Sequence, residues 1–260
     1  MNSMKKSFPV KSLIQVSMLI ALALVIRNFS YMVYFGGAPG MRIGFSGVFT
    51  KIASILFGPV LGGAASGIVD FLGYVIKPEG AYIPLLTITS ILGGVLIGFM
   101  WKLTGDVVSL KFKRFFLVLI LFFGVFGVAN QIILSYFTNF FWANILHMLG
   151  KYTPFTTVGL ELVSCAGLLF YAVDILLKKL HGTAINHSSY LKVVIITGIS
   201  GILVTTLNTC ILQMFIPALG RMGFIMLWIP RVIEEILMTL IHAYIISLLL
   251  AIYKKNFPAD

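Results

Sequence analysis

The fold is decided by the stretch from Arg42 to Gly98, which reads RIGFSGVFTKIASILFGPVLGGAASGIVDFLGYVIKPEGAYIPLLTITSILGGVLIG. It contains three consecutive apolar segments, and tight turns at 57–59 and 77–80 join them. Glycine and proline mark both turns, because these residues interrupt helices and favour reversals. The stretch therefore predicts three closely packed helices. Lys51 and Asp70 lie within the apolar segments, and Arg42 lies just before the first of them, at the expected entrance to the bundle.

Composition places the chain in a membrane. Hydrophobic residues make up 59% of its 260 residues and charged residues only 10%, whereas a soluble domain carries about 25% charged residues. The apolar runs are long and continuous, which favours helices over the short alternating segments of a membrane barrel. We expect an all-α, polytopic membrane helix bundle.

A helix needs about 20 residues to cross the hydrocarbon core, and fewer where it is short or kinked. By that measure the sequence predicts eight spans, at 12–30, 43–58, 60–77, 82–102, 115–138, 156–177, 191–216 and 225–252. No stretch between them is long enough for a soluble domain. Residues 1–260 are therefore expected to form a single integral membrane domain.

The net charge of +11 does not come from one basic patch, so no nucleic-acid partner is expected. Basic residues form small groups between spans, as in cytoplasmic loops. With a cytoplasmic N-terminus, the inner side carries Lys5, Lys6, Lys11, Lys111, Lys113, Arg114, Lys178, Lys179, Lys254 and Lys255. The outer side carries mainly Arg42, Lys77, Lys151 and Arg221. This asymmetry predicts that both termini are cytoplasmic.

Pairs of small residues four apart recur in the spans and let helix backbones approach closely. The pairs are Ser17/Ala21, Gly58/Gly62, Gly63/Gly67 and Gly94/Gly98. They indicate either packing inside the bundle or docking to another membrane subunit. Ser17 and Ala21, on the first span, are the candidates for a subunit interface.

Four acidic residues interrupt the apolar runs, namely Asp70, Glu161, Glu234 and Glu235. An ion in hydrocarbon costs at least about 2.5–3.5 kcal/mol, so each should face a partner or a cavity. Counted from Pro59 on two antiparallel helices, Lys51 and Asp70 differ in depth by only about 4.5 Å. They can form a structural ion pair or face a ligand.

The last span carries a second polar group. Arg231 and Glu235 are four residues apart and can pair on one helix face, whereas Glu234 points about 100° away. Pro230 just before them is compatible with a kink or a late helix start. This group indicates either pairing on the helix surface or a polar pocket wall, to which Asn208 of the preceding span could add an amide.

No catalytic motif accompanies these charges. The sequence contains no GxxxxGK[ST] phosphate loop, no HExxH and no GxSxG. The adjacent glutamates lack the arginine of a Glu-Glu-x-x-x-Arg protease motif, because Thr239 stands at that position. We expect a non-enzymatic protein with no catalytic residue, cofactor or metal site.

Several short motifs resemble the substrate-binding S component of energy-coupling factor (ECF) vitamin transporters, in particular the folate-type group. They are Met41-Arg42-Ile43, Leu56-Phe57-Gly58-Pro59, Asp70-Phe71-Leu72-Gly73-Tyr74, the Pro78/Gly80 loop, Ile20-Ala21-Leu22-Ala23-Leu24, and the region from Asn208 to Trp228-Ile229-Pro230-Arg231. Together they cover about two thirds of the chain.

The resemblance implies a six-helix core at 12–104 and 190–252, with a transmembrane helix pair inserted at 112–180. It implies capture of a vitamin, folate in the first place, from outside a prokaryotic plasma membrane. A transmembrane scaffold subunit and two cytoplasmic ATPases would deliver the vitamin, with the S component reorienting in the bilayer.

Folate suits these side chains, since its aminopyrimidine edge wants a carboxylate and its glutamate tail wants arginine or lysine. The predicted ligand-binding residues are Arg42, Asp70, Tyr74, Asn208, Arg231, Glu234 and Glu235. Two departures weaken the match to folate: Glu234-Glu235 replace a Lys-Asn type pair, and Lys51 replaces a small residue. The alternatives are another vitamin or small molecule, a membrane enzyme using intramembrane glutamates, or an accessory subunit without ligand.

Overall fold

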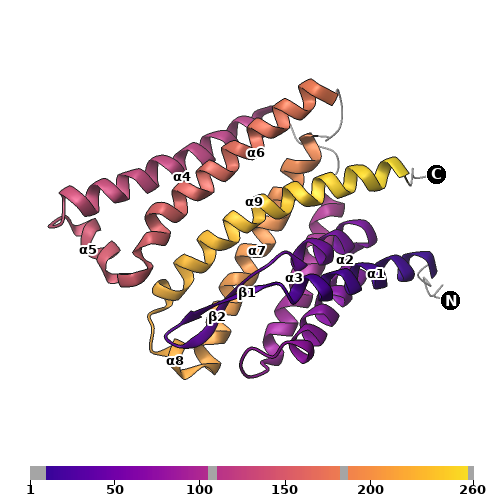
Figure 1. Ribbon diagram of the computed structural model, residues 1–260, viewed down its shortest axis with the longest axis horizontal. Helices are drawn as coiled ribbons and strands as arrows, with labels where there is room; N and C mark the ends of the chain where they lie inside the picture. The colour runs from indigo at the N-terminus through magenta and orange to yellow at the C-terminus, as the bar shows by residue number, and fades with distance from the viewer. Residues whose placement is uncertain (1–9, 105–109, 182–186, 257–260) are drawn as a thin grey trace. The chain divides into compact units, whose positions relative to one another are not determined.

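The computed structural model describes residues 10–104, 110–181 and 187–256 (Figure 1). Lys5 and Lys6, which contribute to the predicted orientation, lie outside the described residues. The elements are α1 (Val10–Arg27), β1 (Tyr31–Phe35), β2 (Ala38–Ile43), α2 (Ser46–Ile76), α3 (Pro84–Leu103), α4 (Leu110–Tyr136), α5 (Phe141–Met148), η1 (Gly150–Tyr152), η2 (Phe155–Gly159), α6 (Leu160–His181), α7 (His187–Phe215), α8 (Pro217–Gly220) and α9 (Phe224–Asn256).

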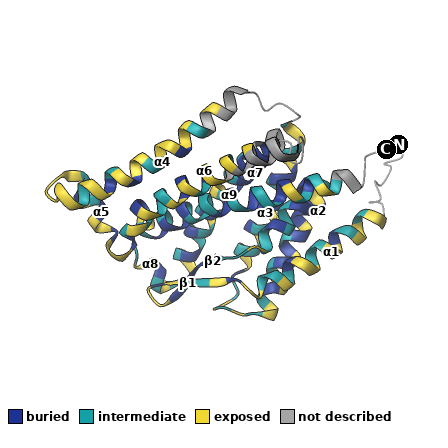
Figure 2. Cartoon of the chain, turned by 45° about the horizontal axis from the view of Figure 1, so that its top comes forward, coloured by how far each residue is buried: buried dark blue, intermediate teal, exposed yellow. Residues whose placement is uncertain are grey.

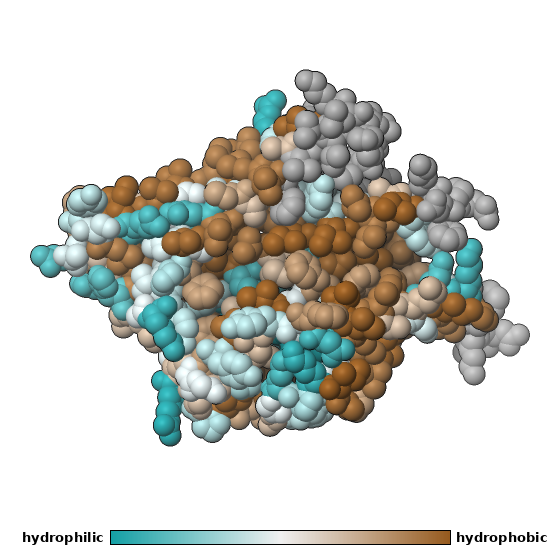
Figure 3. Space-filling model, in the orientation of Figure 1, coloured by the Kyte–Doolittle hydropathy of each residue, from teal (hydrophilic) through white to brown (hydrophobic). Residues whose placement is uncertain are grey.

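The prediction of an all-α polytopic membrane bundle is confirmed. Within the described residues, six helices are long and apolar enough to cross a membrane, namely α1, α2, α3, α4, α7 and α9. Two of the eight predicted spans fall in α2, and the span predicted at 156–177 overlaps α6, which is not among these six helices. Apolar residues make up most of the face drawn in Figure 3, as expected for a surface in contact with lipid.

The chain divides into two compact units. The first contains α1, α2 and α3, and its central feature is a reversal inside α2. Gly58 there has φ 86° and ψ −176°, a conformation that is essentially restricted to glycine. A Cβ on Gly62 would collide with Ser54, eight residues earlier, so the two halves of α2 lie against each other. The predicted turn before Pro59 is therefore correct.

Small residues bring α2 and α3 into close contact. A Cβ on Gly63 would lie 2.7 Å from Val95, and one on Gly67 would lie 2.6 Å from Ile91. From the α3 side, a Cβ on Gly94 would lie 2.5 Å from the carbonyl oxygen of Gly62. These glycines pack inside the unit, which is the first of the two roles that the sequence left open for them.

The second unit contains residues 32–43 and 104–260, and therefore most of the β1–β2 hairpin and α4 to α9. Its helices pack chiefly as two pairs, α7 with α9 and α4 with α6. Glycines again allow the approach, since a Cβ on Gly124 of α4 would lie 2.6 Å from Ser164 of α6. Exposed residues run along α4 in Figure 2.

Two local features of this unit were not predicted. Residues 31–43 form a hairpin, and the short helix α5 lies between the predicted spans 115–138 and 156–177, the second of which begins in η2. The hairpin has a sequence signal, because the aromatic run Tyr31–Phe35 is followed by Gly36 and Gly37. Both glycines have positive φ (56° and 83°), as the type I′ two-residue hairpin turn requires.

Candidate functional site

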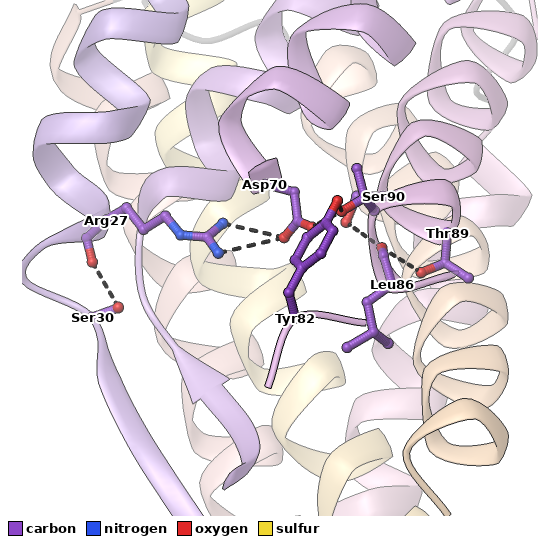
Figure 4. A network of polar contacts seen from close by, with 8 residues as sticks. Arg27, Ser30, Asp70, Tyr82, Leu86, Thr89 and Ser90 are labelled. Carbon is purple, nitrogen blue, oxygen red and sulfur yellow. Dashed lines mark hydrogen bonds and ion pairs between the residues drawn. The ribbon is translucent and has the colours of Figure 1, made fainter. Parts of the chain in front are cut away.

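A half-buried ion pair links α1 and α2 in the first unit. Nη1 and Nη2 of Arg27 each lie 3.4 Å from Oδ1 of Asp70, and Oγ1 of Thr87 donates a 2.7 Å hydrogen bond to Oδ2 (Figure 4). The side chains of Arg27 and Asp70 are 12% and 24% exposed. Both carboxylate oxygens of Asp70 therefore already accept hydrogen bonds within the protein.

Glycine makes room for this pair. Arg27 occupies the last turn of α1, and its side chain reaches Asp70 by crossing the surface of α2 at Gly73. A Cβ on Gly73 would collide with Nε and Cδ of Arg27. Because residues three apart share a helix face, Asp70 and Gly73 act together as the receptor for the guanidinium.

Aromatic side chains extend the Asp70 network. The hydroxyl of Tyr82 lies 2.9 Å from Oγ1 of Thr87, and it donates there because Thr87 uses its own hydrogen on Asp70. The ring of Tyr82 lies 5.0 Å from that of Tyr74 and 5.8 Å from that of Phe71, between centroids. In Figure 4 the Tyr82 ring stands beside the Asp70 carboxylate. The result is a charged group flanked by aromatic surfaces.

Lys77 fixes the end of α1 from the other side. Its Nζ donates to the carbonyl oxygens of Asn28 (3.4 Å) and Ser30 (3.1 Å), and lies 3.2 Å from Oε1 of Glu79. Carbonyl groups at a helix C-terminus lack intrahelical donors and attract cations. The C-terminal end of α1 is thus tied to α2 twice, by Arg27 to Asp70 and by Lys77 to these carbonyl groups.

The second unit carries its own charged group, on α9. Arg231 is 8% exposed, and the carboxylates of Glu234 and Glu235 interact with it electrostatically. Its Nε and Nη1 are buried and make no hydrogen bond within the part of the chain that the structure describes. A buried guanidinium with donors to spare is suited to binding an acceptor group of a ligand.

Glu235 faces α7. Its two carboxylate oxygens lie 3.4 Å from the hydroxyls of Thr205 and Thr239, and a Cβ on Gly201 would collide with Oε1. The half-buried Asn208 lies three residues beyond Thr205 on α7, and residues so spaced share a helix face. The seam between α7 and α9 is therefore polar around Glu235.

The structure groups the predicted ligand residues by unit. Asp70 and Tyr74 belong to the first unit, while Arg42, Asn208, Arg231, Glu234 and Glu235 belong to the second. Among the described residues, no group of three or more His, Cys, Asp or Glu could hold a metal ion.

Comparison with known proteins identifies the class of protein. Residues 11–164, more than half of the chain, match the family described as ECF transporter, substrate-specific component. The chain belongs to this family. It is accordingly a multi-pass membrane protein of the S-component type, as its apolar helices also indicate.

One similar protein is the folate transporter FolT of Clostridium novyi (strain NT), which is 34% identical to this S component over 89 residues. Those residues are 34% of this chain and 49% of the relative, so the match spans about half the relative's length and this chain is the longer. No solved structure matches.

Sequence reasoning gave no role to two central residues of this S component, Arg27 and Thr87. Arg27 had a usable signal, because it falls within the predicted span 12–30, where a cation must pair with another group, face a cavity or extend its side chain to the interface. The partner that the structure gives to Asp70 is Arg27, whereas a contact between Lys51 and Asp70 stays a prediction. Thr87 had no signal, since a threonine in a membrane helix usually bonds to its own backbone.

Proposed function

We propose that this S component binds folate at the outer side of the membrane and serves as the substrate-binding subunit of a vitamin importer. Family membership and the similarity to a folate transporter support this proposal. The structural observation that supports folate binding is Arg231. This residue is 8% exposed, and its Nε and Nη1 have no hydrogen-bond acceptor among the described residues. The glutamate tail of folate supplies carboxylates that suit such a guanidinium.

The acidic neighbours of Arg231 fit the other end of folate. The aminopyrimidine edge presents paired N–H donors, and Glu234 or Glu235 can accept them. Asp70 is the weaker candidate for this role, because it pairs with Arg27 and accepts a 2.7 Å hydrogen bond from Thr87, whereas the hydroxyls beside the Glu235 oxygens lie 3.4 Å away. We therefore assign ligand recognition first to Arg231, Glu234 and Glu235, and to Asn208 beside them.

Titration of the purified chain with folate tests the assignment. We expect nanomolar affinity for the wild type and a loss of roughly 30-fold or more in Arg231→Gln, since truncating one side of a buried charged contact costs at least about 2 kcal/mol. Arg221→Gln is the matched control, because Arg221 is exposed. If the purified chain binds neither folate nor any other vitamin, the proposal is wrong.

A second candidate is import of a different vitamin or related small molecule. The observation that favours it is the pair of adjacent carboxylates on α9, which suits a ligand with cationic or several N–H groups. A panel of vitamins on the same protein separates the two. Tighter binding of another vitamin than of folate, abolished by Glu234→Gln or Glu235→Gln, would favour this candidate.

We also propose that transport energy comes from separate subunits, a transmembrane scaffold and two cytoplasmic ATPases, as the family implies. Ser17 and Ala21 are exposed on α1, while Val16 and Ala23 are buried, which supports a small-residue docking face. Replacing Ser17 and Ala21 by leucine should abolish co-purification with the scaffold. Ala64→Leu, at an exposed position of α2, should leave it unchanged.

A further inference from the structure

The β1–β2 hairpin cannot hold its position alone. It consists of Tyr31–Phe35 and Ala38–Ile43, and a two-stranded hairpin is at best marginally stable without packing. The predicted ligand residue Arg42 stands near the end of β2. Whatever holds the hairpin therefore also positions Arg42.

Two contacts within the second unit hold it. At the tip, a Cβ on Gly36 would lie 3.7 Å from the carbonyl oxygen of Ala218 in α8 and 3.8 Å from the sulfur of Met222 (Figure 1). In the body, Phe35 is 0% exposed and its ring centroid lies 4.8 Å from that of Tyr152, at 36°. The Phe35 ring also covers Gly40 of β2, where a Cβ would collide with it.

Tyr152 is itself rigidly held. It ends η1, its backbone N–H donates to the carbonyl oxygen of Leu149, and Thr153 donates from Oγ1 to the carbonyl oxygens of Leu146 and Gly150 at 3.0 and 2.7 Å. The side chain is 7% exposed. Its hydroxyl is buried and makes no hydrogen bond with any residue the structure describes, so the ring alone makes the contact.

We propose that Tyr152 is a positioning residue for ligand binding. Its ring clamps Phe35, keeps the hairpin against the second unit, and so holds Arg42 where a ligand meets it. The proposal rests on the proposed function, that the chain binds a vitamin, and on the sequence-based prediction that Arg42 contacts this ligand. Tyr152 lies in the segment 112–180, which is the predicted addition to the six-helix pattern. The proposal therefore gives this segment a function, which is to position the hairpin.

The mobility of the hairpin tests the clamp without any ligand. A spin label at Tyr34→Cys, an exposed position of β1, is placed in protein whose native Cys165 and Cys210 are replaced by serine. We expect Tyr152→Leu to broaden the range of label motion and to raise the folate dissociation rate up to roughly tenfold, the upper range for a lost aromatic pair.

Three further variants make the test decisive. Tyr152→Phe keeps the ring and should behave as wild type, and Tyr136→Leu, an exposed aromatic of α4, should also leave label mobility unchanged. Phe35→Leu removes the same contact from the strand side and decides the matter if Tyr152→Leu does not fold. Unchanged mobility in Phe35→Leu and in folded Tyr152→Leu would overturn the clamp. Wild-type protein that binds no vitamin would instead overturn the proposed function, with the label result standing.

Discussion

The ion pair between Arg27 and Asp70 should couple α1 to α2 energetically. At 3.4 Å and an effective dielectric constant of about 20, the attraction between two unit charges is about 5 kcal/mol. Desolvation of both groups opposes this attraction. Since the Asp70 side chain is 24% exposed, we expect a net coupling of about 2 kcal/mol.

A double-mutant cycle measures this coupling. Arg27→Gln and Asp70→Asn should each lower the free energy of unfolding by about 2–4 kcal/mol, because each leaves a half-buried charge without its counter-ion. The double variant should lose about 2 kcal/mol less than the sum. Unfolding in mixed micelles with increasing dodecyl sulfate, followed by helical circular dichroism, gives the three values.

The pair Lys77–Glu79 serves as a comparison. The Lys77 side chain is 40% exposed, although that of Glu79 is only 10% exposed, so solvent screens the lysine and a cycle on Lys77→Gln and Glu79→Gln should show weaker coupling than the cycle on Arg27 and Asp70. If the effects of Arg27→Gln and Asp70→Asn add within about 0.5 kcal/mol, the reasoning about the pair is refuted.

The same variants decide whether Asp70 also contacts ligand, as the sequence predicts. Both of its oxygens accept hydrogen bonds from Arg27 and Thr87, so Asp70→Asn should weaken stability far more than folate affinity. A loss of affinity comparable to that of Arg231→Gln would instead assign Asp70 to the ligand.

Three further outcomes are expected. Gly73→Ala should destabilise the wild type by about 1–3 kcal/mol, because the new Cβ collides with Arg27. In an Arg27→Ala background the same change should be neutral or stabilising, because alanine favours the helix. Chemical unfolding of the protein with and without Gly73→Ala, in each background, measures both effects. Gly58→Ala should cost about 1–3 kcal/mol because only glycine adopts that backbone conformation readily, and a thermal midpoint equal to wild type would contradict it. Ala81→Cys, at an exposed position between α2 and α3, in protein whose Cys165 and Cys210 are replaced by serine, should react with an impermeant maleimide in intact cells while a C-terminal fluorescent fusion is bright, as outer and cytoplasmic locations require; the reverse pattern would invert the topology.

The sequence predicted the positions of the long helices well because their cause is local. A run of about 20 apolar residues specifies a membrane helix by itself, and a Gly-Pro step between two such runs specifies a break. The reversal at Gly58 and the glycine contacts of α2 with α3 follow from such signals. The hairpin at 31–43 also had a local signal, the aromatic run before Gly36-Gly37, although it was not used.

The pairing of charges could not be predicted in the same way. Arg27 and Asp70 are 43 residues apart, and the sequence does not state which helices are neighbours or how each is rotated about its axis. On helix spacing alone, Lys51 is as good a partner for Asp70 as Arg27. Only the packing of α1 across Gly73 gives Arg27 its path to the carboxylate.

By itself, then, the sequence determined that this chain is a helical membrane protein, where its spans lie, and which polar residues they must accommodate, because hydrophobic length and turn chemistry act within short windows. The tertiary structure alone decided what each polar residue touches. In the structure Asp70 contacts Arg27 and Thr87, Glu235 faces α7, and the ring of Phe35 packs against that of Tyr152. Such contacts depend on distances across the fold, to which residues far apart in the sequence contribute jointly.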